Sequence, residues 1–320
     1  MLRPFLCLLL VTATASPAWC QFNKKPETAP APAAAPKLDK PATNKYQVGM
    51  RIRAVGGPCV GLSGTFAVPA EWEDQTVKQI DEKVSAHIRN FSKRSGDSGL
   101  QQVVFQIPQL PAGETATILF TYEVVTNSTA PPADTSGLVI PKNPPRDVRK
   151  HLLASPQIEI ANPKIRALAK ELTDGKETAW EQVQALYDGV REKVKLENDK
   201  LKGAALTLKD GQGAEEDVAA VFVALCRAHK VPARTTFVPD SCHAEFYLED
   251  AEGKGSWFPV VIEGDKAFGY RPTATIILQR GDNVRVPELK DPQRFVAEHL
   301  TGKGGTGGRP EVEFVRRVEH

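Results

Sequence analysis

The spacing of apolar residues changes once along this 320-residue chain, and that change limits the folds it can adopt. Between residues 45 and 125, β-branched and aromatic residues alternate with polar ones, as in Val48, Met50 and Ile52. A period of two is typical of strands that bury one face. From about Ala161 the apolar residues recur every three or four positions, which is typical of amphipathic helices. Strands followed by helices predict an α+β protein with two folded parts.

The first part is predicted to be a small antiparallel β domain, a sandwich by its pattern, over residues 45–125. One stretch inside it, residues 73–91, departs from the alternation. Val77, Ile80, Val84 and Ile88 are spaced by three and four residues, which favours one face of a helix.

The second part, residues 161–290, carries clear signals for helix starts. Asn162 followed by Pro163 is a cap and first-turn proline, and Thr178 with Glu181 forms a capping box. A third helix is expected over residues 215–229. Three strands are expected to follow over residues 233–238, 244–248 and 257–262, with residues 126–160 as a connector and 291–320 as a polar tail, Gly-rich at 302–308.

The N-terminus has the pattern of a secretory signal peptide over residues 1–20. A basic start precedes an apolar run from Phe5 to Ala15, too short to span a membrane, and small residues follow it. Residues 21–44 are rich in Pro, Ala and Lys and predict an extended linker. We therefore expect an extracytoplasmic protein, secreted or periplasmic, with no membrane span after cleavage. A lipoprotein acylated at Cys20 is the alternative, which the bulky Trp19 before it disfavours.

Charge and cysteine content exclude several classes of protein. Lys plus Arg number 41 against 39 Asp plus Glu, a net of +2, so no nucleic-acid partner is expected. Three cysteines follow the linker, Cys59, Cys226 and Cys242, and an odd number does not make a disulfide scaffold, although Cys226 and Cys242 are a candidate pair. No Cys or His spacing is typical of a zinc site, so neither metal nor cofactor is predicted.

Several strings of the second part form a recognisable series. They are Gly213–Asp217, Phe222–Ala228 and Val231–Arg234, then Ser241–Leu248 and Trp257–Pro259, with Trp180 on the preceding helix. Together they resemble the transglutaminase-like superfamily, a relative of papain-type cysteine proteases. The resemblance implies a transglutaminase-like, papain-like domain preceded by the β domain. It also implies acyl transfer or amide hydrolysis by a Cys at a helix start, a His on one strand and an Asp on the next.

This sequence departs from the family pattern at all three catalytic positions. Glu215 stands where the Cys is expected, Ser241 where the His is expected and Val261 where the Asp is expected. His243 lies two residues beyond Ser241 on the same strand face, about 6–7 Å away. Cys242 points to the opposite face from His243, so the two are a poor nucleophile–base pair.

We therefore expect a catalytically inactive domain that serves as a binding or structural module. Its groove is expected between helix and sheet at Trp180, Glu215, Ser241, His243 and Trp257. A protein or peptide ligand is expected, with a basic one favoured by Glu215, although Glu215 as a mere helix-start charge is the simpler explanation. The alternatives are an active cysteine-type amidase, peptidase or protein-glutamine acyltransferase with a non-standard site, and a structural envelope component.

Overall fold

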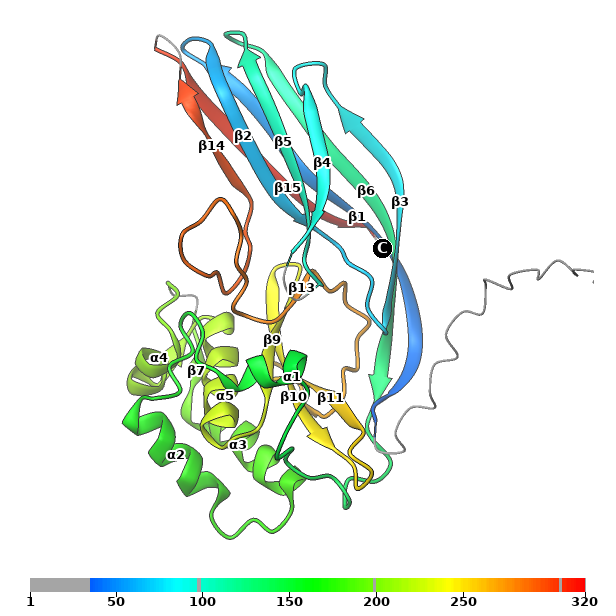
Figure 1. The fold of residues 1–320 in the computed structure, drawn as a ribbon, viewed down its shortest axis with the longest axis vertical. Helices are drawn as coiled ribbons and strands as arrows, with labels where there is room; N and C mark the ends of the chain where they lie inside the picture. The colour runs from blue at the N-terminus through cyan, green and yellow to red at the C-terminus, as the bar shows by residue number, and fades with distance from the viewer. Residues whose placement is uncertain (1–34, 97–98, 198–199, 305–306, 320) are drawn as a thin grey trace, which may run out of the picture. The chain divides into compact units, whose positions relative to one another are not determined.

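The alternating segments form a sandwich of two antiparallel four-stranded sheets, whose strands are labelled in Figure 1. One sheet has the order β15-β1-β6-β3, with bounds Arg309–Glu319, Lys37–Val55, Thr115–Ala130 and Gln75–Val84. The other has the order β14-β2-β5-β4, with bounds His299–Gly304, Cys59–Val68, Gln101–Leu110 and Asn90–Ser95. Met50, Phe66, Phe105 and Phe120 are buried between them, as their alternation requires.

This computed structural model describes residues 35–319, apart from 97–98, 198–199 and 305–306. The described residues all belong to one unit, Pro32–His320. The predicted signal peptide and most of the predicted linker lie outside them. Within the described ranges, no helix combines the length and the apolar character needed to cross a membrane.

The predicted boundaries of the β domain differ from the observed ones at both ends. β1 begins at Lys37, inside the predicted linker, and β6 runs to Ala130, inside the predicted connector. The ladder between these two strands is irregular between Leu38 and Pro41, where a proline has no N–H to contribute.

The predicted polar tail is in fact two edge strands of the sandwich. β14 pairs with β2, and β15 pairs with β1 over eleven positions from Lys45–Glu319 to Val55–Arg309. An edge strand keeps one face in solvent, so its charged residues resemble those of a tail. Val315 on β15 is 2% exposed, and Val312 and Val318 pack against the core between the two sheets.

The predicted helix over residues 73–91 is wrong, since β3 occupies Gln75–Val84. A bulge between Gln79 and Asp81 shifts the register against β6. Because one extra residue reverses the alternation, Val77 and Val84 both pack against the core, while Ile80 is exposed. The bulge thus produces a spacing that imitates a helix.

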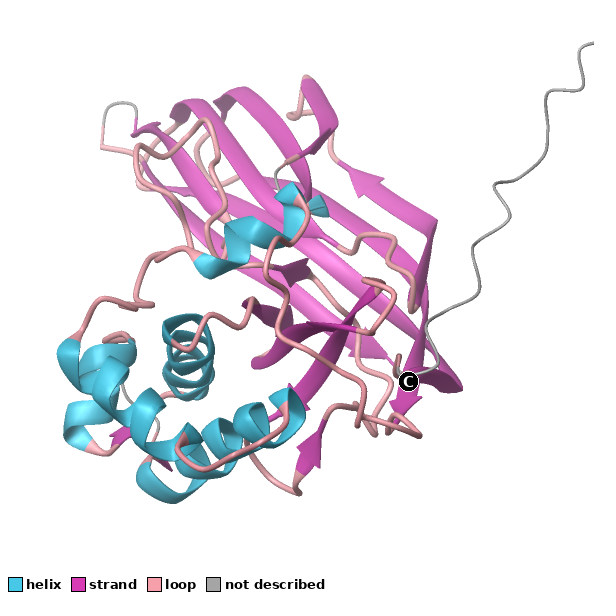
Figure 2. Cartoon of the chain, turned by 60° about the horizontal axis from the view of Figure 1, so that its bottom comes forward, coloured by secondary structure: helices cyan, strands magenta, loops and turns pink. Residues whose placement is uncertain are grey.

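The second part is a five-stranded antiparallel sheet with helices gathered on one side of it (Figure 2). Its order is β12-β11-β10-β9-β13, with bounds Ala267–Phe268, Gly255–Val261, Ser241–Glu249, Ala233–Val238 and Gln279–Arg280. The main helices are α2, α3, α4 and α5, with bounds Pro163–Thr173, Ala179–Lys193, Ala204–Asp210 and Glu215–Ala228. Short elements are α1 (Arg146–Arg149), the 3-10 turn η2 (Lys150–Leu152) and the parallel pair β7 (Lys195–Leu196) and β8 (Gln212–Gly213).

The predicted helix starts and the α+β class are confirmed. Asn162 caps α2, and the Thr178–Glu181 capping box opens α3. α5 is almost wholly buried, and Val221, Phe222 and Leu225 have no exposed surface. The end of this helix is fixed by Arg227, whose guanidinium donates to both carboxylate oxygens of Asp282 at 2.9 and 2.7 Å.

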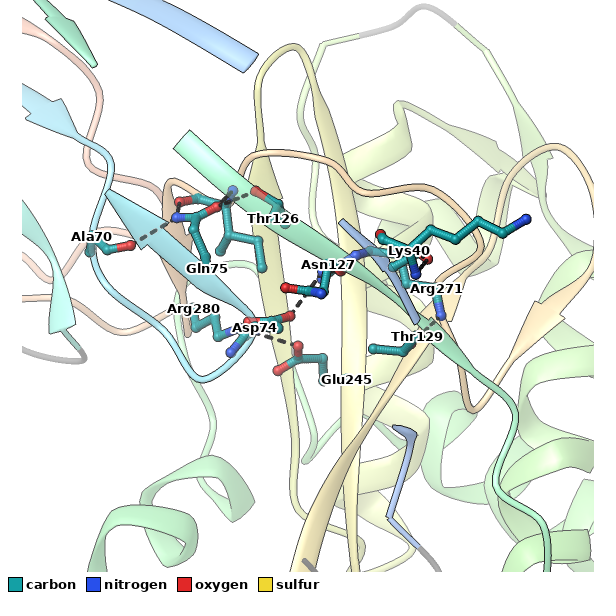
Figure 3. Close-up of polar contacts among 12 residues, drawn as sticks. Lys40, Ala70, Asp74, Gln75, Thr126, Asn127, Thr129, Glu245, Arg271 and Arg280 are labelled. Carbon is teal, nitrogen blue, oxygen red and sulfur yellow. Dashed lines mark hydrogen bonds and ion pairs between the residues drawn. The ribbon is translucent and has the colours of Figure 1, made fainter. Parts of the chain in front are cut away.

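Buried polar groups join the sandwich to the five-stranded sheet (Figure 3). Asp74, before β3, forms ion pairs with Arg271 at 2.9 Å and Arg280 at 2.8 Å. Arg280 also pairs with Glu245 of β10 at 3.3 Å, and Glu245 pairs with Arg234 at 2.7 Å. Five charges that alternate in sign therefore offset one another in a mostly buried cluster.

Candidate functional site

The N-terminus of α5 places a carboxylate at the expected nucleophile position. Glu215 is the first residue of the helix, after the extended Ala214, whose side chain cannot cap it. Glu215, Glu216 and Asp217 all lie in the first turn, where negative charge is favoured by the helix dipole. Asp217 is fully buried and accepts hydrogen bonds from the backbone N–H groups of Lys202 and Gly203.

Ser241 meets Glu215 directly. It is the first residue of β10 and follows the two-residue turn Pro239–Asp240 that joins β9 to β10. Its hydroxyl donates to Oε1 of Glu215 at 2.6 Å. The two positions at which the resemblance expects a Cys and a His are therefore in contact, with a carboxylate and a hydroxyl in their place.

A cavity of about 560 Å³ opens beside this pair. Its ionisable walls are strongly acidic, with a single arginine: Glu197, Glu215, Glu216, Asp240, Glu298 and Arg316. Its apolar walls come from both folded parts: Ala67, Leu196, Leu201, Phe237, Leu278 and Phe295. Mixed walls with a few convergent polar groups are typical of small-ligand sites.

A further carboxylate interacts with Glu215. Burial raises the pKa of Glu263, the negative charge of Glu215 raises it further, and Arg191 partly offsets both. Glu263 lies two residues beyond Val261, the position where the resemblance expects the Asp. The sequence analysis did not single it out.

Val261 contributes no ionisable group, as expected from its side chain. It is half-buried at the end of β11, and its backbone carbonyl accepts a hydrogen bond from the Tyr187 hydroxyl at 2.9 Å. This position therefore links the sheet to α3.

His243 does not line the cavity beside Glu215, which corrects its expected place in the groove. Burial lowers the pKa of His243 to about 4, Arg271 lowers it and Glu245 raises it, and no charge of the cavity acts on it. No described group hydrogen-bonds its buried Nδ1. Among the described residues, no hydrogen bond or ion pair joins His243 to Glu215, so the structure contains no Glu215–His243 acid–base pair.

The two tryptophans expected to frame the groove lie elsewhere. Trp180 packs its ring against Phe246, Phe258 and Phe268 in the helix–sheet core. Trp257 contacts His151 and Tyr247, and the Arg234 guanidinium lies 3.9 Å from the centre of its ring. Neither lines the cavity, so of the five expected groove residues only Glu215 and Ser241 do.

The cysteines of the described residues are all free and buried. Cys226 and Cys242 therefore do not form the candidate disulfide. Cys242 is 3% exposed, and burial raises its pKa well above the ordinary value, with Glu216 raising it further. A thiol in this state is a poor nucleophile. Among the described residues, no three His, Cys, Asp or Glu side chains are grouped to hold a metal ion.

The cavity also contains residues that sequence reasoning missed, namely Tyr46, Asp240, Glu298 and Arg316. Tyr46 lies on β1, and Arg316 lies on the strand predicted to be a tail. Only Asp240 carried a local signal, because it follows a proline in a turn between two strands. The others reach the cavity through pairings between distant parts of the chain.

Comparison with known proteins agrees with this architecture. Residues 166–261 match the sequence model of the transglutaminase-like superfamily. A putative cysteine protease from Cytophaga hutchinsonii superposes with a TM-score of 0.57 and 17% identity, over 88% of this chain and 99% of that chain. At that identity the likeness is one of fold alone.

A putative protease from Parabacteroides distasonis reaches a TM-score of 0.29 and 13% identity, over 71% of this chain and 48% of that chain, which is too low to indicate a shared fold. No curated protein matches the sequence.

Proposed function

We propose that this chain, whose residues 166–261 form a transglutaminase-like domain, is a non-catalytic binding module that holds a basic peptide segment in the cavity beside Glu215. The observation that carries the proposal is the 2.6 Å hydrogen bond from Ser241 to Glu215. It joins the two positions where the family resemblance calls for a thiol and an imidazole.

The side chains at these positions do not suit thiol catalysis. A carboxylate is a weak nucleophile toward amides, and a serine hydroxyl that donates to it cannot act as a general base. The nearest thiol on β10, Cys242, is buried and protonated. The imidazole of His243 does not line the cavity, and burial lowers its pKa to about 4. No pair of these groups supports thiol acyl transfer.

The charges of the cavity favour a cationic ligand. Five carboxylates and one guanidinium line the cavity; Glu298 is paired with Arg316 and Glu216 with Arg294, which leaves Glu197, Glu215 and Asp240 as the excess negative charge. Negative charges gathered in a concave site attract cations and repel anions. Lysine and arginine side chains have the matching charge, and the apolar walls suit their aliphatic stems.

The N-terminal pattern supports a place outside the cytoplasm. Residues 1–20 have the composition of a signal peptide and lie outside the described residues. An exported module of this kind would meet peptides or proteins of the cell envelope or its surroundings.

Loss of catalysis is tested by amine incorporation, glutamine deamidation and peptide hydrolysis with the purified protein. We expect no turnover from the wild type or from Glu215→Cys alone, because the base and its orienting carboxylate are also missing. The triple variant Glu215→Cys, Ser241→His, Val261→Asp is the positive control. Its turnover would show that the three catalytic positions of the family are correctly assigned in this sequence. Turnover by the wild type that disappears in Cys242→Ser would instead establish an active cysteine enzyme with a non-standard site.

Binding is tested by isothermal titration with lysine-containing peptides and their norleucine counterparts. We expect the lysine peptides alone to bind, with an affinity that falls as salt rises. Glu215→Gln should weaken binding, while Glu192→Gln, the same change on an exposed part of α3, should not. If no lysine peptide binds the wild type at millimolar concentration, the binding proposal is wrong and Glu215 merely stabilises its helix.

A further inference from the structure

The cavity contains a second polar group, the hydroxyl of Tyr46, which belongs to the sandwich. Tyr46 lies on β1, its ring is part of the core between the two sheets, and only 1% of the residue is exposed. It nevertheless lines the cavity. Within the described part of the chain, no protein group hydrogen-bonds its hydroxyl. The hydroxyl is not among the buried polar atoms that lack a partner, so it reaches the solvent space of the cavity, where a ligand group can replace water as its partner.

The charged side chains that act on this hydroxyl also line the cavity. Burial raises the pKa of Tyr46, Glu298 and Asp240 raise it further, and Arg316 lowers it. These three residues line the cavity together with Tyr46. The hydroxyl therefore lies close enough to these three side chains to interact with their charges, and it borders the same cavity.

Of the two carboxylates that act on Tyr46, Asp240 is the one without an ion-pair partner among the described residues. Arg316 donates from two nitrogens to both oxygens of Glu298, which occupies that carboxylate. No ion pair to Asp240 is present among the described residues. Asp240 also holds a left-handed backbone conformation with φ +59°, which costs free energy in a residue other than glycine. The turn thus fixes an exposed, unpaired carboxylate next to Ser241 in sequence.

We propose that the cavity binds two alkylammonium groups of one ligand, the first at Glu215 and Ser241 and the second between the Tyr46 hydroxyl and the Asp240 carboxylate. This inference rests on the proposed function and narrows its ligand to two neighbouring lysine side chains. A free linear polyamine has the same chemistry, since both present ammonium groups on flexible methylene chains. The apolar walls, among them Phe237, Phe295 and Leu278, would contact the methylene groups.

The hydrogen-bonding roles are complementary. An ammonium group offers three donors and no acceptor. A phenol oxygen and carboxylate oxygens accept these donors, and the phenol proton can itself be donated to Asp240. A ligand with one ammonium group would leave Tyr46 and Asp240 to water and would gain no hydrogen bond from either of them.

The experiment is isothermal titration of the full chain with four probes. They are the capped peptides acetyl-Gly-Lys-Lys-Gly-amide and acetyl-Gly-Lys-norleucine-Gly-amide, together with 1,4-diaminobutane and butylamine. The proteins are the wild type, Tyr46→Phe, Asp240→Asn, Glu215→Gln and the exposed control Glu192→Gln. Tyr46→Phe keeps the ring and the net charge, and asparagine tolerates the left-handed conformation at position 240.

We expect the two-ammonium member of at least one pair to bind the wild type about tenfold or more tightly than its one-ammonium partner. Tyr46→Phe should weaken the two-ammonium probe by about 3- to 20-fold, the loss of one hydrogen bond, and leave the one-ammonium probe unchanged. Glu215→Gln should weaken both. The pair that shows the effect identifies whether the natural source is a lysine peptide or a polyamine.

The outcomes separate the two proposals. If one- and two-ammonium probes bind equally and depend on Glu215 but not on Tyr46, the binding function stands and the second subsite is wrong. If the two-ammonium preference persists in Tyr46→Phe, the subsite is also wrong, because long-range charge alone then explains it. If neither peptide nor amine binds at all, both proposals are overturned.

Discussion

The Ser241 hydroxyl lies 2.6 Å from Oε1 of Glu215, so the first residue of β10 is joined to the first residue of α5. This contact spans 26 positions of sequence and connects the helix to the sheet at the mouth of the acidic cavity. The same carboxylate acts on Glu263. Four measurements test how this site and its scaffold behave.

The first prediction concerns the pair of carboxylates. Burial raises the pKa of Glu263 and the charge of Glu215 raises it further. Glu215→Gln removes that charge, so the pKa of Glu263 should fall toward its ordinary value. Carbon-detected NMR titration of the side-chain carboxyls measures it. Ser241→Ala is the control, because Glu215 keeps its charge there, and a Glu263 pKa that is the same in all three proteins would contradict the placement.

The second prediction concerns the buried ion pair of α5. Arg227 is 2% exposed and donates to Asp282, to the backbone carbonyls of Leu153 and Ala233, and to Ser155. Arg227→Met leaves the Asp282 charge buried without its cation and should cost about 3–5 kcal/mol of unfolding free energy. Urea denaturation measures this cost. Arg166→Met, the same change at an exposed position of α2, should cost less than about 1 kcal/mol.

The third prediction concerns acid. Burial lowers the pKa of His151 to about 3 and that of His243 to about 4. In the unfolded chain both bind a proton near pH 6.5, so the folded state binds fewer protons and stability falls as pH drops from about 6.5 to about 4. Burial alone would raise the pKa of Glu245, but Arg280 and Arg234 hold it at about 2, so a second loss begins below the ordinary glutamate pKa of about 4.3.

The measurement is the urea midpoint at half-unit steps from pH 7 to pH 3. His243→Gln should flatten the upper part of the curve, and Glu245→Gln should flatten only the part below pH 4.5. A wild-type midpoint that stays constant down to pH 4 would show that these histidines are not buried in the neutral form.

The fourth prediction concerns the C-terminal strand. If β15 pairs with β1 as observed, backbone amides over residues 312–318 that face β1 are protected from hydrogen exchange. Val315→Asp should abolish that protection, because it buries a charge at a position that is 2% exposed. Phe314→Asp, at a position that is 46% exposed, is the control and should change it little. Exchange within seconds across the whole segment in the wild type would mean that it is a tail.

The sequence determined the elements whose signals are local. The Asn162 cap, the Thr178–Glu181 capping box and the apolar period of residues 215–228 each lie within one or a few helical turns, and all three helices form as predicted. The strands over residues 233–238, 241–249 and 255–261 follow from β-branched runs and short turns. Such signals depend on residues that are close together in the sequence, so they can be recognised without knowing how distant parts of the chain pack.

The tertiary structure alone decided the rest. Only pairing with β6 shows that Val77 and Val84 belong to a bulged strand, and only pairing with β1 makes residues 309–319 a strand. The cavity joins Tyr46 to Glu215 and to Arg316, which are more than 100 positions apart in sequence. Its composition is set by which strands pair and which faces they bury. Those choices depend on contacts between distant residues, which no local period or cap encodes.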